Sequence, residues 1–280
     1  MPIVVNTNVA SINAQRQLGI NNAKLQKSLE RLSSGLRINR AADDAAGLAI
    51  TSKMRAQVRG MAQAVRNAND GISLIQTAEG SLEEIYNILS RIRELAEESA
   101  NGTLGQEERD LIDTEFQQLY QEIDRISNVA EFNGKKLLDG SISSTGISLQ
   151  VGVHNTDNDK IEIKIDDVSA SALGLGADGT ITTLSTQEMA RSALDIVDSA
   201  IKIISRNRGR LGAQQNRLDS TISNLNITIE NQQASISRIR DVDFAAETAR
   251  YTQQQILVQT GTAILAQANA LPQAALSLLR

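Results

Sequence analysis

Proline is missing from almost the whole of this chain of 280 residues, since it occurs only at Pro2 and Pro272. Because proline is the residue that most reliably breaks a helix, long uninterrupted helices are permitted over the entire interval. Aromatic residues make up only 2% of the sequence, although 41% of it is hydrophobic. This composition favours narrow helical seams over a wide core or an aromatic-lined ligand pocket.

Apolar residues recur in steps of four and three close to both ends of the chain. The leading stripe has one polar member, Asn22. The stripes consist of Leu18, Leu25, Leu29, Leu32 and Leu36 at the front, and of Leu257, Gly261, Ile264, Ala268, Leu271, Ala275 and Leu278 at the back. Since chain ends fray unless something holds them, we expect two terminal helices that pair as a coiled coil and then dock on a partner.

Between these ends the helical spacing predicts three further helices. Apolar positions from Val58 to Ile92 indicate one helix of about 50 residues that ends near Asn101 and Gly102. A capping-box pattern at 103–106 predicts the start of an antiparallel neighbour. A second capping-box pattern, at 185–188, predicts a third long helix that continues to a bend at 241–243.

The period changes from helical to two in the middle of the chain. Alternating apolar residues at 147–153 and again at 161–165 predict a β-hairpin within about 138–168. The glycine-rich stretch that follows, 169–184, is predicted to be a short exposed tip.

The expected fold is therefore mainly α, a long antiparallel helical bundle or coiled coil with a small β-hairpin region. Residues 1–44 and 236–280 are predicted to form one domain of paired terminal helices. Residues 45–168 and 185–235 are predicted to form a second, long-helix domain that carries the hairpin.

The residues that most catalysis requires are scarce. His154 is the only histidine and there is no cysteine, which removes histidine-paired metal sites, Ser-His-Asp catalysis and thiol nucleophiles. A literal G-x-G-x-x-G at 174–179 does not open a helix after a strand, so we interpret it as a loop. No catalytic, cofactor-binding or metal-binding residue is predicted, and the chain is not expected to be an enzyme.

Glutamates occur as adjacent pairs at 83–84, 97–98 and 107–108. Adjacent residues of a helix diverge by about 100°, so these pairs do not converge on a substrate. The net charge of −5 argues against a nucleic-acid surface. No apolar run is long enough to cross a membrane, and the first residues do not have the pattern of a secretory signal peptide.

Two segments of the chain resemble the terminal signatures of bacterial flagellins. Residues 30–50, ERLSSGLRINRAADDAAGLAI, resemble the N-terminal signature, and AQAN at 266–269 with PQ at 272–273 and LSLL at 276–279 resembles the C-terminal one. The similarity extends over about 1–165 and 187–280. It identifies the chain as a member of this family in a minimal form, without the large variable outer domains.

The resemblance implies a structural subunit that polymerises into the helical flagellar filament used for swimming motility. The paired terminal helices would form its inner tube and the long-helix domain its outer tube. It implies that Leu18, Leu25, Leu29, Leu32, Leu36, Leu257, Ile264, Leu271 and Leu278 lie at the filament's inner-core interface. The main partners would be many copies of the same chain.

The resemblance also implies a route out of the cell and further partners. Flagellins pass unfolded through the type III export apparatus of the flagellum without a cleaved signal peptide and become extracellular. The implied partners are an export chaperone, the hook–filament junction and the filament cap.

One further implied partner is the innate immune receptor Toll-like receptor five. The stretch that it recognises in some flagellins resembles residues 89–96, with a glutamate on the next helix, so that Arg91, Leu95 and Glu115 occupy the corresponding positions. Subunit packing is the alternative role for these residues, and both roles stay open.

Two other functions stay open as alternatives. A hook–filament junction protein shares flagellin-like ends, and electron microscopy of the purified protein would distinguish it from a filament subunit. An enzyme displayed at 169–183 is disfavoured, because that segment is short and contains neither histidine nor cysteine.

Overall fold

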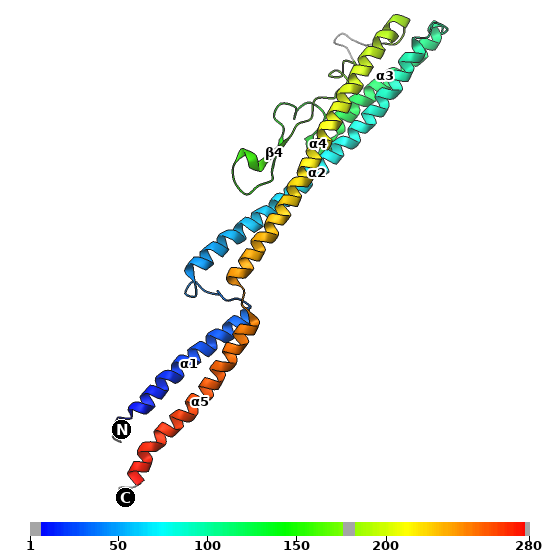
Figure 1. Ribbon diagram of the computed structural model, residues 1–280. Coiled ribbons are helices and arrows are strands. Elements are labelled where there is room, and N and C mark those ends of the chain that lie inside the picture. Colours follow the sequence, from blue (N-terminus) through cyan, green and yellow to red (C-terminus); the bar gives the residue numbers. More distant parts are fainter. Residues whose placement is uncertain (1–6, 176–182, 278–280) are drawn as a thin grey trace. The chain divides into compact units, whose positions relative to one another are not determined.

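The computed structural model describes residues 7–175 and 183–277 (Figure 1). Its long helices are α1 (Val9–Ser34), α2 (Ala45–Ser99), α3 (Gln106–Val129), α4 (Gln187–Arg240) and α5 (Phe244–Ser277). The chain divides into two compact units, unit 1 with residues 1–58 and 230–280, and unit 2 with residues 59–229. The prediction of a mainly α fold of long helices with a small β region is confirmed.

A regular buried stripe on α2 organises unit 2. It advances in alternating steps of three and four residues, which is the spacing that keeps one side of a long helix against a neighbour. Its members are Met61, Ala64, Ala68, Gly71, Ile75, Ala78, Leu82, Ile85, Leu89, Ile92, Ala96 and Ser99. The predicted helix of about 50 residues is confirmed by α2, which has 55.

The antiparallel helix α4 carries the matching stripe. Its buried members in unit 2 are Ala190, Ala193, Val197, Ala200, Ile204, Asn207, Leu211 and Leu218. Arg93 on α2 donates to Asp198 on α4 at 2.8 Å, and Leu218 approaches Gly71, which fixes the alignment of the two helices. Phe116 and Ile123 of α3 complete this core.

The ends of these helices differ in detail from the predicted capping patterns. The capping box predicted at 103–106 is wrong. Helix α3 begins at Gln106 with Gly105 as its N-cap, and no side chain caps it by a hydrogen bond. Asn101 instead accepts a hydrogen bond from the Thr103 amide at 3.2 Å. At the start of α4 the capping oxygen belongs to Thr186, which accepts from the Met189 amide.

The predicted hairpin is confirmed by the antiparallel strands β3 (Ile147–Gln150) and β4 (Lys160–Ile163), joined through the short helix η1 (Asp157–Asp159). A second, smaller hairpin, β1 (Glu131–Phe132) with β2 (Lys135–Lys136), was not predicted. Its turn residues Asn133 and Gly134 both have positive φ, of 51° and 74°. Asn-Gly is the residue pair that such a two-residue turn favours.

The predicted exposed tip is wrong for the part of it that the structure describes. Ala170, Leu173, Leu175 and Leu184 are all buried in the core of unit 2. Leucines at these positions are anchors, because their burial removes apolar surface from water. Residues 176–182, which include most of the G-x-G-x-x-G match, lie outside the described residues.

The close approach of β3 to α2 gives a prediction about Gly71. A Cβ atom there would meet Leu149 Cδ1 at 2.2 Å, whereas a Cβ at the exposed Gly80 of the same helix would meet nothing within 4 Å. We expect Gly71→Leu to lower the free energy of unfolding by about 2 kcal/mol, the usual cost of overpacking. Gly80→Leu, the matched control, should raise it by up to about 0.8 kcal/mol through helix propensity. Chemical denaturation measures both, and equal effects would contradict the packing.

Candidate assembly interface

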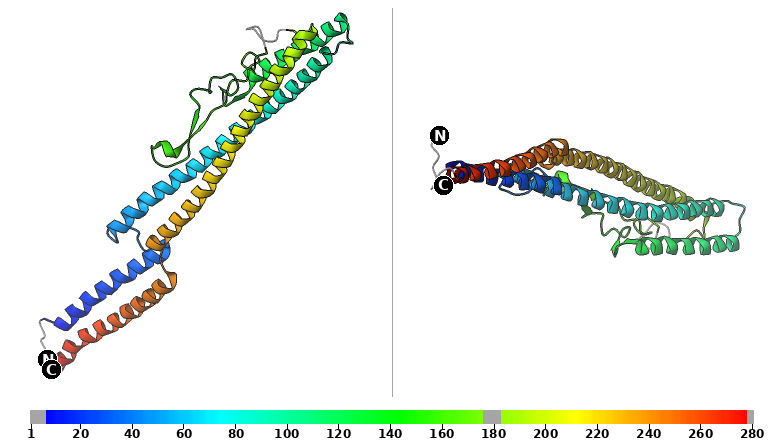
Figure 2. Two further views of the ribbon diagram at one scale, coloured as in Figure 1. Left: turned by 45° about the horizontal axis from the view of Figure 1, so that its top comes forward. Right: turned by 90° about the horizontal axis from the view of Figure 1, so that it is seen from below.

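The helices α1 and α5 of unit 1 lie side by side and antiparallel (Figures 1 and 2). Near one end, the side-chain amide of Asn8 donates to the Ala268 carbonyl at 2.7 Å, and the Ser11 hydroxyl bonds Asn269 at 2.7 Å. Near the other, the Val242 amide donates to the Gly35 carbonyl at 3.0 Å. The pair is thus held in one alignment by polar contacts at both ends.

The seam between the two helices combines fully buried small or polar residues with half-buried leucines. The fully buried residues of α1 are Ser11, Asn21 and Ser28, and Leu18, Leu25 and Leu32 on the same side of the helix are half-buried. On the α5 side Gly261 has no side chain, and a Cβ there would lie 3.2 Å from Leu18 Cδ1. Because the leucines are buried only in part, the isolated pair gains less hydrophobic stabilisation than a seam of fully buried leucines would give.

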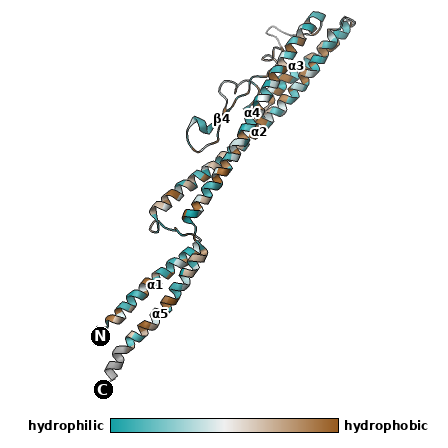
Figure 3. Ribbon diagram, viewed as in Figure 1, coloured by the Kyte–Doolittle hydropathy of each residue, from teal (hydrophilic) through white to brown (hydrophobic). Residues whose placement is uncertain are grey.

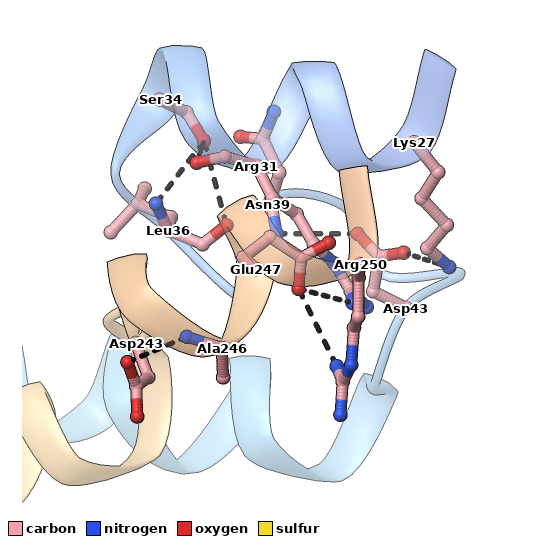
Figure 4. Close-up of polar contacts among 10 residues, drawn as sticks. All are labelled: Lys27, Arg31, Ser34, Leu36, Asn39, Asp43, Asp243, Ala246, Glu247 and Arg250. Atoms are coloured by element: carbon pink, nitrogen blue, oxygen red, sulfur yellow. Dashed lines mark hydrogen bonds and ion pairs between the residues drawn. The ribbon is translucent and has the colours of Figure 1, made fainter. Parts of the chain in front are cut away.

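A buried carboxylate pairs with arginines from both helices. Glu247 of α5 is only 3% exposed, and its Oε2 lies 3.7 Å from Arg31 Nη1 on α1 and 3.4 Å from Arg250 Nη1 (Figure 4). A buried charge is strongly destabilising when its partner is removed. This cluster therefore favours one register of α1 against α5, and sequence periodicity did not identify it.

The connector between α1 and α2 is fixed by Asp43. Its carboxylate lies 2.6 Å from Lys27 Nζ and accepts a hydrogen bond from the backbone amide of Asn39 (Figure 4). The backbone amide of Arg40 donates a second hydrogen bond to it. The Lys27 hydrogen bond, with help from these amides, lowers the pKa of Asp43 from 3.8 to about 2. Since the folded pKa is depressed, this contact stabilises the connector at neutral pH and is lost as the pH falls from about 4 to about 2.

Several large apolar side chains of the terminal helices are exposed instead of lying in the seam. Leu29 is 54% exposed, Leu257 is 39% and Ile264 is 53%. Further members are Val9, Ile12, Ile20 and Ile256. Figure 3 shows apolar residues along α5. Unit 1 thus presents apolar side chains outside the α1–α5 contact.

The predicted stripes correspond to this arrangement only in part. Leu18, Leu25, Leu32 and Leu36 are half-buried, whereas Leu29 is exposed. The less exposed positions of α5 are Gln254, Val258, Gly261, Leu265 and Ala268. The seam shares Gly261 and Ala268 with the predicted stripe but leaves Leu257 and Ile264 outside it. Leu271 lies within α5, and Leu278 lies outside the described residues.

The predicted receptor or packing surface of unit 2 also needs a correction. Arg91 donates to Glu115 at 2.9 Å and to Glu94 at 3.0 Å, on the surface. The hydrogen bond to Glu115, and to a smaller extent the one to Glu94, raises the pKa of the Arg91 guanidinium. Leu95, however, is only 1% exposed and belongs to the core. Arg91 and Glu115 are therefore available to a partner, whereas the Leu95 side chain is not.

Within the described ranges, 7–175 and 183–277, no group of three or more potential metal-ligating side chains occurs. None of the helices described there combines the length and the apolar content that a membrane span requires.

Comparison with known proteins gives matches over most of the chain. The model of the bacterial flagellin N-terminal helical region matches residues 5–143, and that of the bacterial flagellin C-terminal helical region matches residues 194–279. Among solved structures, one described as a flagellar hook-associated protein from Vibrio parahaemolyticus shares the fold, with a TM-score of 0.58 and 15% identity over 71% of this chain and 100% of that chain.

Curated relatives extend the similarity over the whole length. A flagellin of Halalkalibacterium halodurans is 49% identical over 99% of this chain and 100% of its own length. A flagellin of Bacillus subtilis is 46% identical over 99% of each chain. The chain belongs to the bacterial flagellin family.

Proposed function

We propose that the chain is the structural subunit that polymerises into the helical bacterial flagellar filament. The observation that carries this proposal is the distribution of apolar residues on α5. Val258 and Leu265 lie on the α1 side, while Ile256, Leu257 and Ile264 are exposed. A helix that is apolar on more than one side is buried in its working state, and further copies of the chain would provide that burial.

Burial of these side chains favours assembly. Burying a fully exposed leucine or isoleucine contributes roughly 1.5–3 kcal/mol, and the exposed apolar side chains of unit 1, which are 39% to 62% exposed, would each contribute roughly half of that. A contact between two different surfaces of the same chain, repeated without closure, produces an open helical polymer. The subunit thus acts through helix packing and has no chemistry of its own.

Within the filament, residues 1–44 and 236–280 would line the inner tube, and 45–168 with 185–235 would form the outer one. The inner-core contacts would include Leu29, Leu257 and Ile264. The chain would leave the cell through the flagellar type III apparatus and meet the export chaperone, the hook–filament junction and the cap. Of the three residues predicted to contact Toll-like receptor five, Arg91 and Glu115 are at the surface and would make that contact without Leu95.

Lysine substitutions on the exposed apolar side of α5 test the assembly proposal. We expect Leu257→Lys and Ile264→Lys to leave the far-ultraviolet circular dichroism of the monomer nearly unchanged, because both side chains reach water there. An unpaired charge buried between copies costs several kcal/mol, so the monomer concentration needed for seeded growth should rise by about a hundredfold or more. Electron microscopy and sedimentation measure the filaments.

Gln255→Lys is the matched control, since it adds the same charge at an exposed polar position of the same helix. It should form filaments as the wild-type chain does. Normal filaments from Ile264→Lys would contradict the proposal. Wild-type protein that joins filament ends but never elongates would instead indicate a hook–filament junction protein.

Limited proteolysis gives an independent test. Because α1 buries only Ser11, Asn21 and Ser28 fully, we expect a protease to trim both ends of the monomer and to spare roughly residues 45–235, which contain the buried stripes of α2 and α4. The same ends should resist in filaments. Mass spectrometry of the fragments identifies the cuts, and monomer ends as resistant as the centre would speak against assembly-dependent burial.

A further inference from the structure

The charges along α2 are separated by sign. From Ala45 to Asn69 the helix carries Lys53, Arg55, Arg59 and Arg66 and no carboxylate. From Asp70 to Ser99 it carries seven carboxylates and two arginines. The separation also holds between the units, since unit 1 has an excess of cations and unit 2 an excess of carboxylates.

This arrangement does not stabilise the helix itself. Arg55 and Arg59 are like charges four residues apart, which weakens a helix. Glu97 and Glu98 lie in the last turn of α2, where the helix dipole favours cations. At both positions the charges destabilise the helix. The stability of α2 therefore does not explain why its charges are separated by sign.

The four cations are also free to meet another molecule. Lys53, Arg55, Arg59 and Arg66 are exposed, and none of them takes part in an ion pair with a residue that the structure describes. We call these four residues the basic segment. By contrast, Arg91 and Arg93 of the same helix each have carboxylate partners.

Carboxylates of unit 2 form the complementary surface. Glu97 and Glu98 end α2, and Glu107 and Glu108 begin α3 after a short turn. All four are exposed, and among the residues that the structure describes only Glu97 has an ion partner, Arg93 at 2.8 Å. We call these four residues the acidic segment. The first turn of α3 suits Glu107 and Glu108, whereas Glu98 has neither a cation nor a favourable helix end.

We infer that the basic segment of one copy binds the acidic segment of another copy. This inference rests on the proposed function and specifies a contact by which the subunit joins its neighbour. The occupant is a second copy, because the same chain presents cations without ion partners in the first half of α2, with Arg55, Arg59 and Arg66 on one side of the helix, and exposed carboxylates where α2 ends and α3 begins. The contact joins two different surfaces, so it can repeat from copy to copy in one direction, and it produces an open polymer when the rotation between copies does not close a ring.

Complementary charges of this kind act mainly on the rate and the orientation of association. Electrostatic steering raises association rates by about 10- to 1000-fold and weakens steeply as salt rises. We therefore expect seeded elongation by the wild-type chain to slow by about tenfold between low and high ionic strength, after correction for any change in monomer stability.

The variant Glu98→Lys distinguishes an effect on assembly from an effect on folding. In the monomer the new cation lies at a helix C-terminus and should keep or slightly raise the unfolding temperature. Elongation at low salt should nevertheless fall by about threefold or more and lose part of its salt dependence. Arg55→Glu should have the same effect on elongation. The double variant should elongate faster than the product of the two single losses allows, because the reversed charges attract again.

Asp157→Lys is the control, since it makes the same change of charge in the exposed connection between β3 and β4. It should elongate at the wild-type rate. If wild-type filaments grow and Glu98→Lys, Arg55→Glu and Asp157→Lys all grow equally fast, the charged contact is overturned and the filament proposal stands. Slowing by all three variants alike also overturns the contact.

If the wild-type chain does not elongate at all, sedimentation of the monomer at low salt tests the charged contact by itself. If the wild-type chain never elongates but self-associates at low salt, and Glu98→Lys abolishes that association, then the contact stands and the filament proposal fails. If the wild-type chain neither elongates nor self-associates, both are overturned.

Discussion

The pairing of α1 with α5, through buried small and polar residues and half-buried leucines, is the constraint on which the function of this chain depends. Ser11, Asn21, Ser28 and Gly261 hold the two helices close, but the leucines beside them are covered only in part, which limits the hydrophobic stabilisation of the isolated pair. The polar anchors, above all Glu247 with its arginines, select an alignment. Apolar side chains that a monomeric protein would bury therefore stay available to other copies.

In unit 2, unlike in unit 1, the buried residues follow a regular spacing along the long helices. This difference explains how much of the fold the sequence could predict. The stripe from Met61 to Ser99 recurs in regular steps of three and four residues, so that the sequence indicates the main buried side of α2, beside which Leu74 and Leu95 are also buried. Its length and its antiparallel partners followed from periodicity alone. In α5, apolar residues occur on several sides, and periodicity could not choose between the side with Leu257 and the side with Val258. The choice depends on α1, whose Leu18 lies against Gly261.

The other errors have equally specific causes. The Asn133–Gly134 turn carried a clear local signal for a hairpin, but its strands have only two residues each and show no alternation. The segment at 169–175 was rich in glycine, alanine and serine, so its two leucines did not register as core anchors. Leu95 was placed on the surface by resemblance, whereas the steps of α2 put it beside Ala96 in the core. In each of these cases tertiary packing determines whether the residue is buried or paired. Local sequence patterns do not report that packing.

A chain that must stay separate before assembly and hold firmly after it needs two kinds of contact. Apolar burial supplies stability but has no direction, because any apolar surface satisfies another. Charge supplies direction, since a basic surface repels its own kind and attracts only the acidic one. The terminal helices carry the first kind of surface and α2 carries the second. The unfavourable placement of Glu98 at a helix end is then understandable, because its partner lies outside the monomer.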